Sequence, residues 1–135
     1  MNKVLWVLQI LLAIGFLMTG GMKLMLPLAD LGAQMAWVND VPGGLVRFIG
    51  LAEILGAIGL ILPAATRIQP NLTAIAAACL ALVMGLAMIF HITRGEFAVM
   101  MPSVVMFVLS AFVAYGRFKL APIAPKAQDN DPAPA

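Results

Sequence analysis

Residues 47–63, RFIGLAEILGAIGLILP, decide the fold class, because they are apolar enough to enter a membrane yet hold a carboxylate, Glu53, in their interior. A charged side chain at the centre of a membrane helix costs roughly 2.5–3.5 kcal/mol on insertion scales. Each neighbouring Leu or Ile contributes only about 0.3–0.6 kcal/mol in favour of insertion. This helix is therefore marginal on its own, and we expect neighbouring helices to supply a partner for Glu53.

The composition is that of an integral membrane protein. Of the 135 residues, 63% are hydrophobic and only 10% are charged, which excludes an ordinary soluble domain. The net charge of +2 is too small and too scattered for nucleic-acid binding. The single cysteine, Cys79, allows no intrachain disulfide, and we expect it to pack as a small residue inside a helix.

Four apolar runs predict four membrane spans, each long enough to cross a hydrocarbon core of about 30 Å. We place them at residues 4–22, 45–62, 72–92 and 97–115. Pro63 is expected to end the second span, and Asn71 to cap the start of the third. The first run is longer than a signal-peptide core of about 7–15 residues, so we expect it to be retained as an anchor.

The segment between the first two spans predicts a short interfacial helix. Leu28, Leu31, Met35 and Val38 recur at near-helical spacing, with Trp37 beside them. Such an amphipathic segment lies in the membrane interface, with its indole at headgroup depth. The expected fold class is thus an all-α integral membrane protein, a four-transmembrane-helix bundle with a short interfacial helix between spans 1 and 2.

Repeated spacings indicate which faces of the helices meet protein. Two polar stripes recur every seven residues, on the first and fourth spans: Gln9, Phe16 and Lys23, and Ser103, Ser110 and Arg117. A stripe of small residues lies on the third span: Ala77, Ala81 and Gly85. We expect these stripes to face the bundle interior. Gly20 and Gly21 are expected to allow a neighbouring helix to approach closely.

Four spans place both chain ends on the same side of the membrane. Five basic residues belong to that side and three to the opposite side: Lys3, Arg67, Arg117, Lys119 and Lys126, against Lys23, Arg47 and Arg94. The positive-inside rule therefore predicts cytoplasmic termini. We expect a membrane domain over residues 1–117, followed by a disordered Pro/Ala-rich cytoplasmic tail over residues 118–135.

Helix lengths place several polar groups at one depth, near the side opposite the termini. At 1.5 Å per residue, Lys23 and His91 both come close to that boundary, and Arg47 and Glu53 enter from it. The expected feature is an outward-facing polar pocket lined by Lys23, Arg47, Glu53, His91 and Ser103, with Gly50 beside the carboxylate. We expect Glu53 to accept a hydrogen bond from Lys23, from His91, or from both.

The chemistry of this cluster is left open by the residues alone. Lys23 and Glu53 can form a buried pair that sets helix register, or the cluster can handle a ligand or a proton. No recognised catalytic spacing is present, so no catalytic residue is assigned, and no metal site is expected.

Three segments resemble the DoxX-like family of small four-span membrane proteins: GFLMTGGMKLMLP (15–27), VPGGLVRFIGLAEILGAIGLILP (41–63) and MGLAMIFHITRGE (84–96). The resemblance extends to Arg117 and rests on the lysine closing the first helix, the G-x-x-E motif and the histidine ending the third helix. It implies a four-helix membrane domain without a firmly assigned general activity. Some members are associated with thiosulfate or quinol oxidation, others with oxidoreductase complexes that handle thiol and superoxide stress, and more distant relatives are chaperones for membrane receptors. The positions that match are Lys23, Arg47, Gly50, Glu53 and His91.

The resulting hypotheses differ in class, and whether the protein is an enzyme is left open. The first is an accessory or assembly subunit of the bacterial inner membrane, in contact with the lipid bilayer and with an oxidoreductase or other membrane partner. The second is a quinone- or small-lipophile-binding oxidoreductase component, in which Lys23 and His91 bond the quinone and Glu53 relays a proton. The third is a small-solute or proton pathway, although the half nearer the termini offers only three polar candidates for a route: Gln9, Thr73 and Ser110.

Overall fold

The structure is a computed structural model that describes residues 1–126, and this part of the chain is helical, without β-strands. Its elements are α1 (Asn2–Met25), α2 (Leu28–Gln34), the 3₁₀ helix η1 (Ala36–Asp40), α3 (Gly43–Thr66), α4 (Asn71–Thr93), α5 (Phe97–Tyr115) and the π-helical turn η2 (Gly116–Leu120). Four helices in this part of the chain are long and apolar enough to cross a membrane: α1, α3, α4, and α5 together with η2. The predicted all-α four-span bundle is therefore confirmed.

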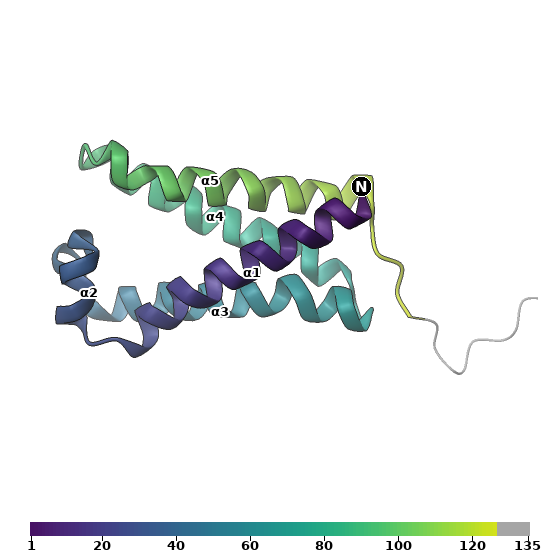
Figure 1. Ribbon diagram of the computed structural model, residues 1–135, viewed down its shortest axis with the longest axis horizontal. Helices are drawn as coiled ribbons and strands as arrows, with labels where there is room; N and C mark the ends of the chain where they lie inside the picture. The colour runs from purple at the N-terminus through teal and green to yellow at the C-terminus, as the bar shows by residue number, and fades with distance from the viewer. Residues whose placement is uncertain (127–135) are drawn as a thin grey trace, which may run out of the picture.

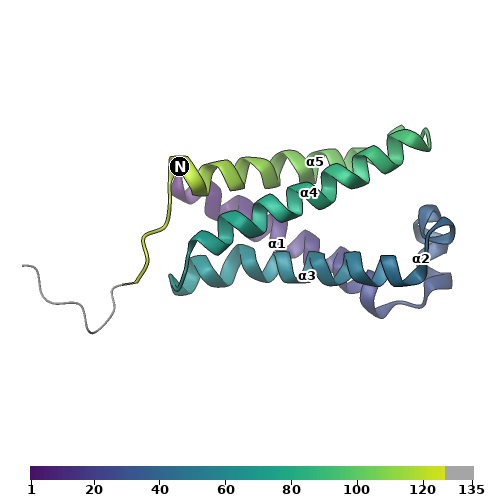
Figure 2. The same ribbon diagram turned by 180° about the vertical axis from the view of Figure 1, so that it is seen from behind.

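The four long helices form two antiparallel pairs (Figure 1). α1 packs along α3, α4 packs along α5, and the contact between α3 and α4 joins the pairs. The N-terminus and the C-terminal end of α5 lie at one end of the bundle, here called the terminal end, whereas α2 and the α4–α5 loop lie at the other, the distal end (Figure 2). The start of the first span and the end of the fourth span are thus at the same end of the bundle, as an even number of spans predicts. The membrane side on which the termini lie stays a prediction.

Two of the predicted helix boundaries are wrong. α3 does not end at Pro63 but continues to Thr66, where Arg67 takes the left-handed conformation at φ 58° and its N–H reaches the Pro63 carbonyl oxygen at 3.0 Å. A proline removes one backbone N–H and crowds the carbonyl four residues earlier, a defect that membrane helices tolerate. Asn71 is the first helical residue of α4 rather than its cap, and its side chain makes no capping hydrogen bond.

The predicted interfacial helix is broken into α2 and η1 at Met35, whose backbone is extended at φ −127° and ψ 91°. Asn39 folds back across this break and donates its Nδ2 to the Gly32 carbonyl oxygen at 3.2 Å. Leu31 and Val38 are buried against Val46 of α3. The apolar side of this segment therefore packs on the start of α3.

Most residues of the predicted inward stripes are buried, whereas Gly85 and Ser103 are only half-buried. Gln9, Phe16 and Lys23 are all buried on α1, and Ala77 and Ala81 are buried on α4. Cys79 lies inside a helix, α4, as predicted, but its side chain is exposed on the outer face rather than packed. The reason is helical spacing, because Ala77, Leu80 and Ala81 occupy the inward side of that helix.

Residues 118–126, the start of the predicted disordered tail, lie against the bundle. η2 extends the last helix to Leu120, and the backbone N–H of Lys126 donates to the Arg67 carbonyl oxygen at 2.9 Å. The remainder of that predicted tail, residues 127–135, lies outside the described residues.

The backbones of α1 and α3 touch at Gly20 and Gly50. A methyl group at Gly20 would lie 2.8 Å from the Gly50 carbonyl oxygen, and one at Gly50 would lie 2.8 Å from the Gly20 carbonyl oxygen. Among residues 1–126, a methyl group at Gly21 would have no neighbour within 4 Å, so of these two glycines only Gly20 shows the expected close approach. This contact sets the distance between the two helices immediately beside Lys23 and Glu53.

The contact predicts different effects for two adjacent glycines. Gly20→Ala forces α1 away from α3, and we expect it to destabilise the bundle by about 1–3 kcal/mol, the range for overpacked sites. Gly21→Ala is the matched control and should leave stability unchanged or slightly raised, because alanine is the better helix former. Thermal unfolding in detergent measures both variants. Equal losses at the two positions would contradict the close approach.

Candidate functional site

The Glu53 carboxylate is the centre of the candidate site and is completely buried, with 0% of its surface exposed. Lys23 Nζ donates to Glu53 Oε1 at 2.6 Å, and Thr19 Oγ1 donates to Oε2 at 2.7 Å. Thr19 and Lys23 are four residues apart and so share one face of α1. The expectation that a base on another helix bonds Glu53 is confirmed for Lys23, and both carboxylate oxygens are occupied.

Arg47 stabilises the same corner without touching Glu53. Its Nη1 donates to the carbonyl oxygens of Lys23 and Leu26, both at 2.7 Å. Lys23 lies in the last turn of α1 and Leu26 caps that helix, so their carbonyls have no N–H group of the helix to accept from, and Pro27 supplies none. Arg47 therefore closes the end of α1 and holds the backbone that carries Lys23.

His91 bonds a different carboxylate. Its Nδ1 lies 3.4 Å from Glu96 Oε1, across the short α4–α5 loop. Of the two partners considered for Glu53, the structure thus provides Lys23 and not His91. Figure 1 shows the physical reason, since the α4–α5 pair diverges from the α1–α3 pair toward the distal end.

The segment α2–η1 links these two centres. The Trp37 ring meets the Phe90 ring edge-on at a centroid distance of 6.1 Å, and Lys23 Nζ lies 5.9 Å from the centroid of Trp37. Phe90 in turn meets the His91 ring at 5.6 Å. An aromatic series therefore runs from the lysine of the buried pair to the histidine of α4.

A group of exposed ion pairs, centred on Arg94, lies at the distal end of the bundle. Arg94 donates from Nη2 to Asp40 Oδ2 at 2.7 Å and from Nε to Glu96 Oε1. The hydrogen bond from Arg94, aided by the weaker one from His91, lowers the pKa of Glu96 against the effect of desolvation. The hydrogen bonds to Asp40 and then to Glu96 raise the pKa of Arg94. The ionised Glu96 carboxylate therefore stabilises the folded state fully at pH values above its ordinary pKa of 4.5. This contribution is lost as the pH falls through the lowered pKa of Glu96 in the folded protein.

The six predicted site residues do not form a single pocket lining. Lys23 and Glu53 are paired, Arg47 binds the backbone beside them, and Gly50 is the packing contact with α1. Ser103 is half-buried on α5, and within residues 1–126 no side-chain hydrogen bond joins it to the others.

Three further residues of this region were not singled out as site residues: Thr19, Trp37 and Glu96. Thr19 could have been added, because it lies one turn before Lys23 on the same stripe. The roles of Trp37 and Glu96 depend on where α4 lies in space, which spacing along the chain does not define.

The site residues lie within a segment that matches a known protein family. The sequence pattern of the DoxX-like family matches residues 7–113, most of the chain, and this range includes all six predicted site residues. The chain belongs to the DoxX-like family. Comparisons with curated proteins and with solved structures found no match. The DoxX-like assignment covers the buried pair and the distal end, whereas Arg117 and the segment after it lie beyond the matched residues.

The pairing predicts non-additive effects of substitution. Glu53→Gln leaves a buried lysine without its counter-charge, and Lys23→Met leaves a buried carboxylate, so each should destabilise the bundle by about 3–5 kcal/mol. The double variant should lose less than the sum of the two, because no isolated charge remains. Unfolding of all three in the same detergent measures the coupling. Additive losses would show that the two side chains do not act as a pair.

Proposed function

We propose that this DoxX-like protein is an accessory or assembly subunit of a redox-related complex in the bacterial inner membrane, with cytoplasmic termini. The observation that carries the proposal is that the three basic groups Lys23, Arg47 and Arg94 at the distal end bind partners within the same chain. Lys23 is paired with Glu53, Arg47 with backbone carbonyls, and Arg94 with two carboxylates. These intrachain hydrogen bonds and ion pairs hold the helices rigidly together. A rigid membrane bundle suits a subunit that positions another protein.

The redox association comes from the family resemblance, which links some relatives to quinol oxidation and others to oxidoreductase complexes. The sequence of this chain has a single cysteine, so a thiol-exchanging disulfide pair within it is excluded. A redox partner would therefore carry the electron-transfer chemistry, with this chain holding it in place.

A groove between α3 and α4 is the contact surface that we propose for the partner. It encloses about 230 Å³ and is lined mainly by small and aliphatic residues: Ala52, Leu55, Gly56, Ala76, Cys79, Leu80 and Val83. Small side chains let another helix backbone approach closely, the usual basis of helix association in lipid. The occupant that fits is a transmembrane helix of the partner, packed over Ala52 and Cys79.

Copurification from the native membrane tests this proposal. Wild-type protein in mild detergent should bring down a stoichiometric membrane partner, and groove-filling Ala52→Leu and Cys79→Phe should reduce the recovery of that partner severalfold. Ala78→Leu is the matched control, because Ala78 is exposed on α4 and does not line the groove. Repeated isolation of a lone monomer or a homo-oligomer would contradict the proposal.

A quinone-binding role is the second candidate, and one observation favours it. The aromatic series of Trp37, Phe90 and His91 lies beside the ammonium group of Lys23. Aromatic walls with a few hydrogen-bonding groups are typical of sites for lipophilic ligands. In this case Lys23 and His91 would hydrogen-bond the quinone oxygens.

Binding of a short-chain ubiquinone analogue separates the two candidates. If the second holds, Trp37→Ala and His91→Ala should each weaken binding about tenfold, the effect of losing roughly 1.4 kcal/mol of contact energy. Trp6→Ala, at the terminal end, is the control and should leave binding unchanged. Identical binding by all four proteins would remove the quinone candidate.

A further inference from the structure

The terminal end holds a second buried charge, the guanidinium of Arg117, which the proposed function does not use. Arg117 is 3% exposed. Its Nε donates to Gln9 Oε1 at 2.6 Å, and its Nη1 donates to Asn2 Oδ1 at 2.7 Å and to the Ala121 carbonyl oxygen at 3.0 Å. Gln9 is itself held by the Leu60 carbonyl oxygen at 2.7 Å. All three acceptors of Arg117 are neutral, so they orient the guanidinium without balancing its charge.

No carboxylate within residues 1–126 forms a salt bridge with Arg117. Three of the four acidic residues in that range belong to distal ion pairs, and Asp30 lies in α2 at the same end. Moreover, Arg117 Nη2 is buried and has no hydrogen-bond partner among residues 1–126. Buried charges in membrane proteins pair with one another, with backbone carbonyls or with a ligand, because an isolated charge is costly; Arg117 has a backbone carbonyl but no opposite charge among the described residues. The described contacts of this site lack one anion.

A cavity of about 460 Å³ lies at the same end of the bundle; Arg117 does not line it, but two residues that bind Arg117 do. Asn2 and Ala121 line it and bind Arg117 directly, and the Trp6 ring, also part of the lining, lies 5.7 Å from Arg117 Cζ. Arg67 lines the same cavity from the end of α3. The cavity lining therefore contains one guanidinium, that of Arg67, and two residues that accept hydrogen bonds from a second, that of Arg117.

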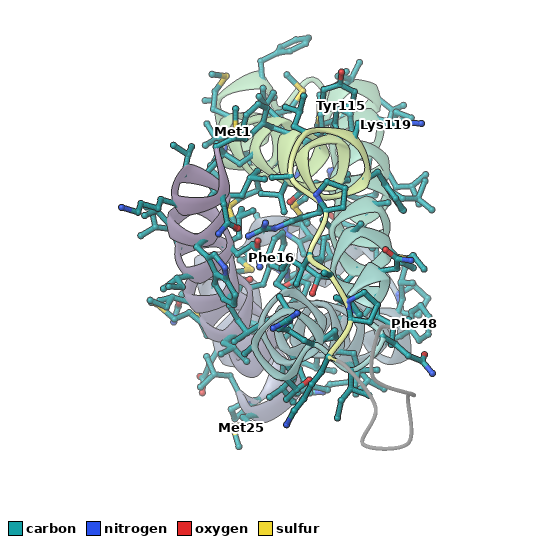
Figure 3. All side chains as sticks on the ribbon, turned by 90° about the vertical axis from the view of Figure 1, so that its right-hand side faces the viewer. Met1, Phe16, Met25, Phe48, Tyr115 and Lys119 are labelled. Carbon is teal, nitrogen blue, oxygen red and sulfur yellow. The ribbon has the colours of Figure 1, made fainter. Side chains whose placement is uncertain are left out.

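The segment after η2 forms one wall of this cavity. Figure 3 looks onto the terminal end and shows the segment crossing the bundle from α5 toward α3. Arg67 Nε holds it there through the Ala124 carbonyl oxygen at 2.8 Å. Arg67 is exposed, so its remaining N–H groups are accessible to a ligand in the cavity.

We propose that this cavity binds a phosphate group, and that the group belongs to an anionic phospholipid headgroup. Planar guanidinium groups match phosphate oxygens in geometry and charge. The cavity lies where the spans end, at headgroup depth, and Trp6 is an interfacial aromatic residue of the kind found there. Basic pockets between membrane helices bind anionic headgroups in this way. The lipid phosphate then supplies the counter-charge for Arg117 and fastens the segment after η2 to the bundle.

Thermal unfolding of the full chain in neutral detergent tests the site with three probes at equal ionic strength: phosphatidylglycerol, phosphatidylcholine and inorganic phosphate. Phosphatidylglycerol should raise the unfolding temperature of the wild type more than either of the others. Arg117→Gln should abolish this increase. Arg67→Gln, at an exposed position that should still fold, should weaken the apparent affinity about tenfold, as expected for losing a charge-assisted contact. Lys119→Gln is the matched control, since Lys119 is exposed on the same turn and does not line the cavity.

Three results would overturn the proposal. Equal increases with phosphatidylglycerol and phosphatidylcholine would show that no anionic group is recognised, and a Lys119→Gln loss as large as that of Arg67→Gln would show only general charge attraction. An equal increase with inorganic phosphate would reject the lipid as the source of the anion. Native mass spectrometry of retained lipid provides a second readout, in which Arg67→Gln should lower the bound phosphatidylglycerol severalfold and Lys119→Gln should not.

Discussion

The ion pair between Lys23 and Glu53 is the interaction on which the α1–α3 half of the bundle depends. Removing two charges from water costs several kcal/mol per ion, and only close geometry with further hydrogen bonds offsets that cost. Both conditions are met, because the pair is 2.6 Å apart, Thr19 occupies the other carboxylate oxygen, and Arg47 holds the backbone of Lys23. The glycine contact beside the pair brings the helices close enough for this bond. A shift of α1 by one turn would separate the charges, so the pair also defines the register of the two helices.

The polar contacts of the bundle fall into two groups at opposite ends. The distal group contains the buried pair and the ion pairs of Arg94, linked by the aromatic ring of Trp37. The terminal group is centred on Arg117 and Gln9. Phe16, which is fully buried on α1, lies between the two groups. The distal end holds α1 and α3 in register, and the terminal end is where we propose that an anionic headgroup binds.

Much of the fold follows from the sequence, because apolar run length and polar spacing are local properties. The fourth span was predicted at residues 97–115, the bounds of α5, and the inward stripe of Gln9, Phe16 and Lys23 is buried. The Lys23–Glu53 bond was predictable because a carboxylate inside a membrane helix requires a nearby donor. The partner of His91 was not, because depth along a helix does not define the lateral separation between helices. For Arg117, the seven-residue spacing from Ser103 and Ser110 predicts burial. Spacing alone does not show that Arg117 has no acidic partner among the described residues, because that depends on the three-dimensional arrangement.

The central claim is that Lys23 and Glu53 are in direct contact inside the membrane. Solid-state NMR in bilayers measures this most directly, through the dipolar coupling between ¹⁵N at Lys23 Nζ and ¹³C at the Glu53 carboxyl carbon. The account predicts a strong coupling, in agreement with the 2.6 Å contact between Nζ and Oε1. The coupling should disappear in Glu53→Gln protein that is labelled only at the lysine and carboxyl groups. The absence of any such coupling in the folded wild-type protein would contradict it.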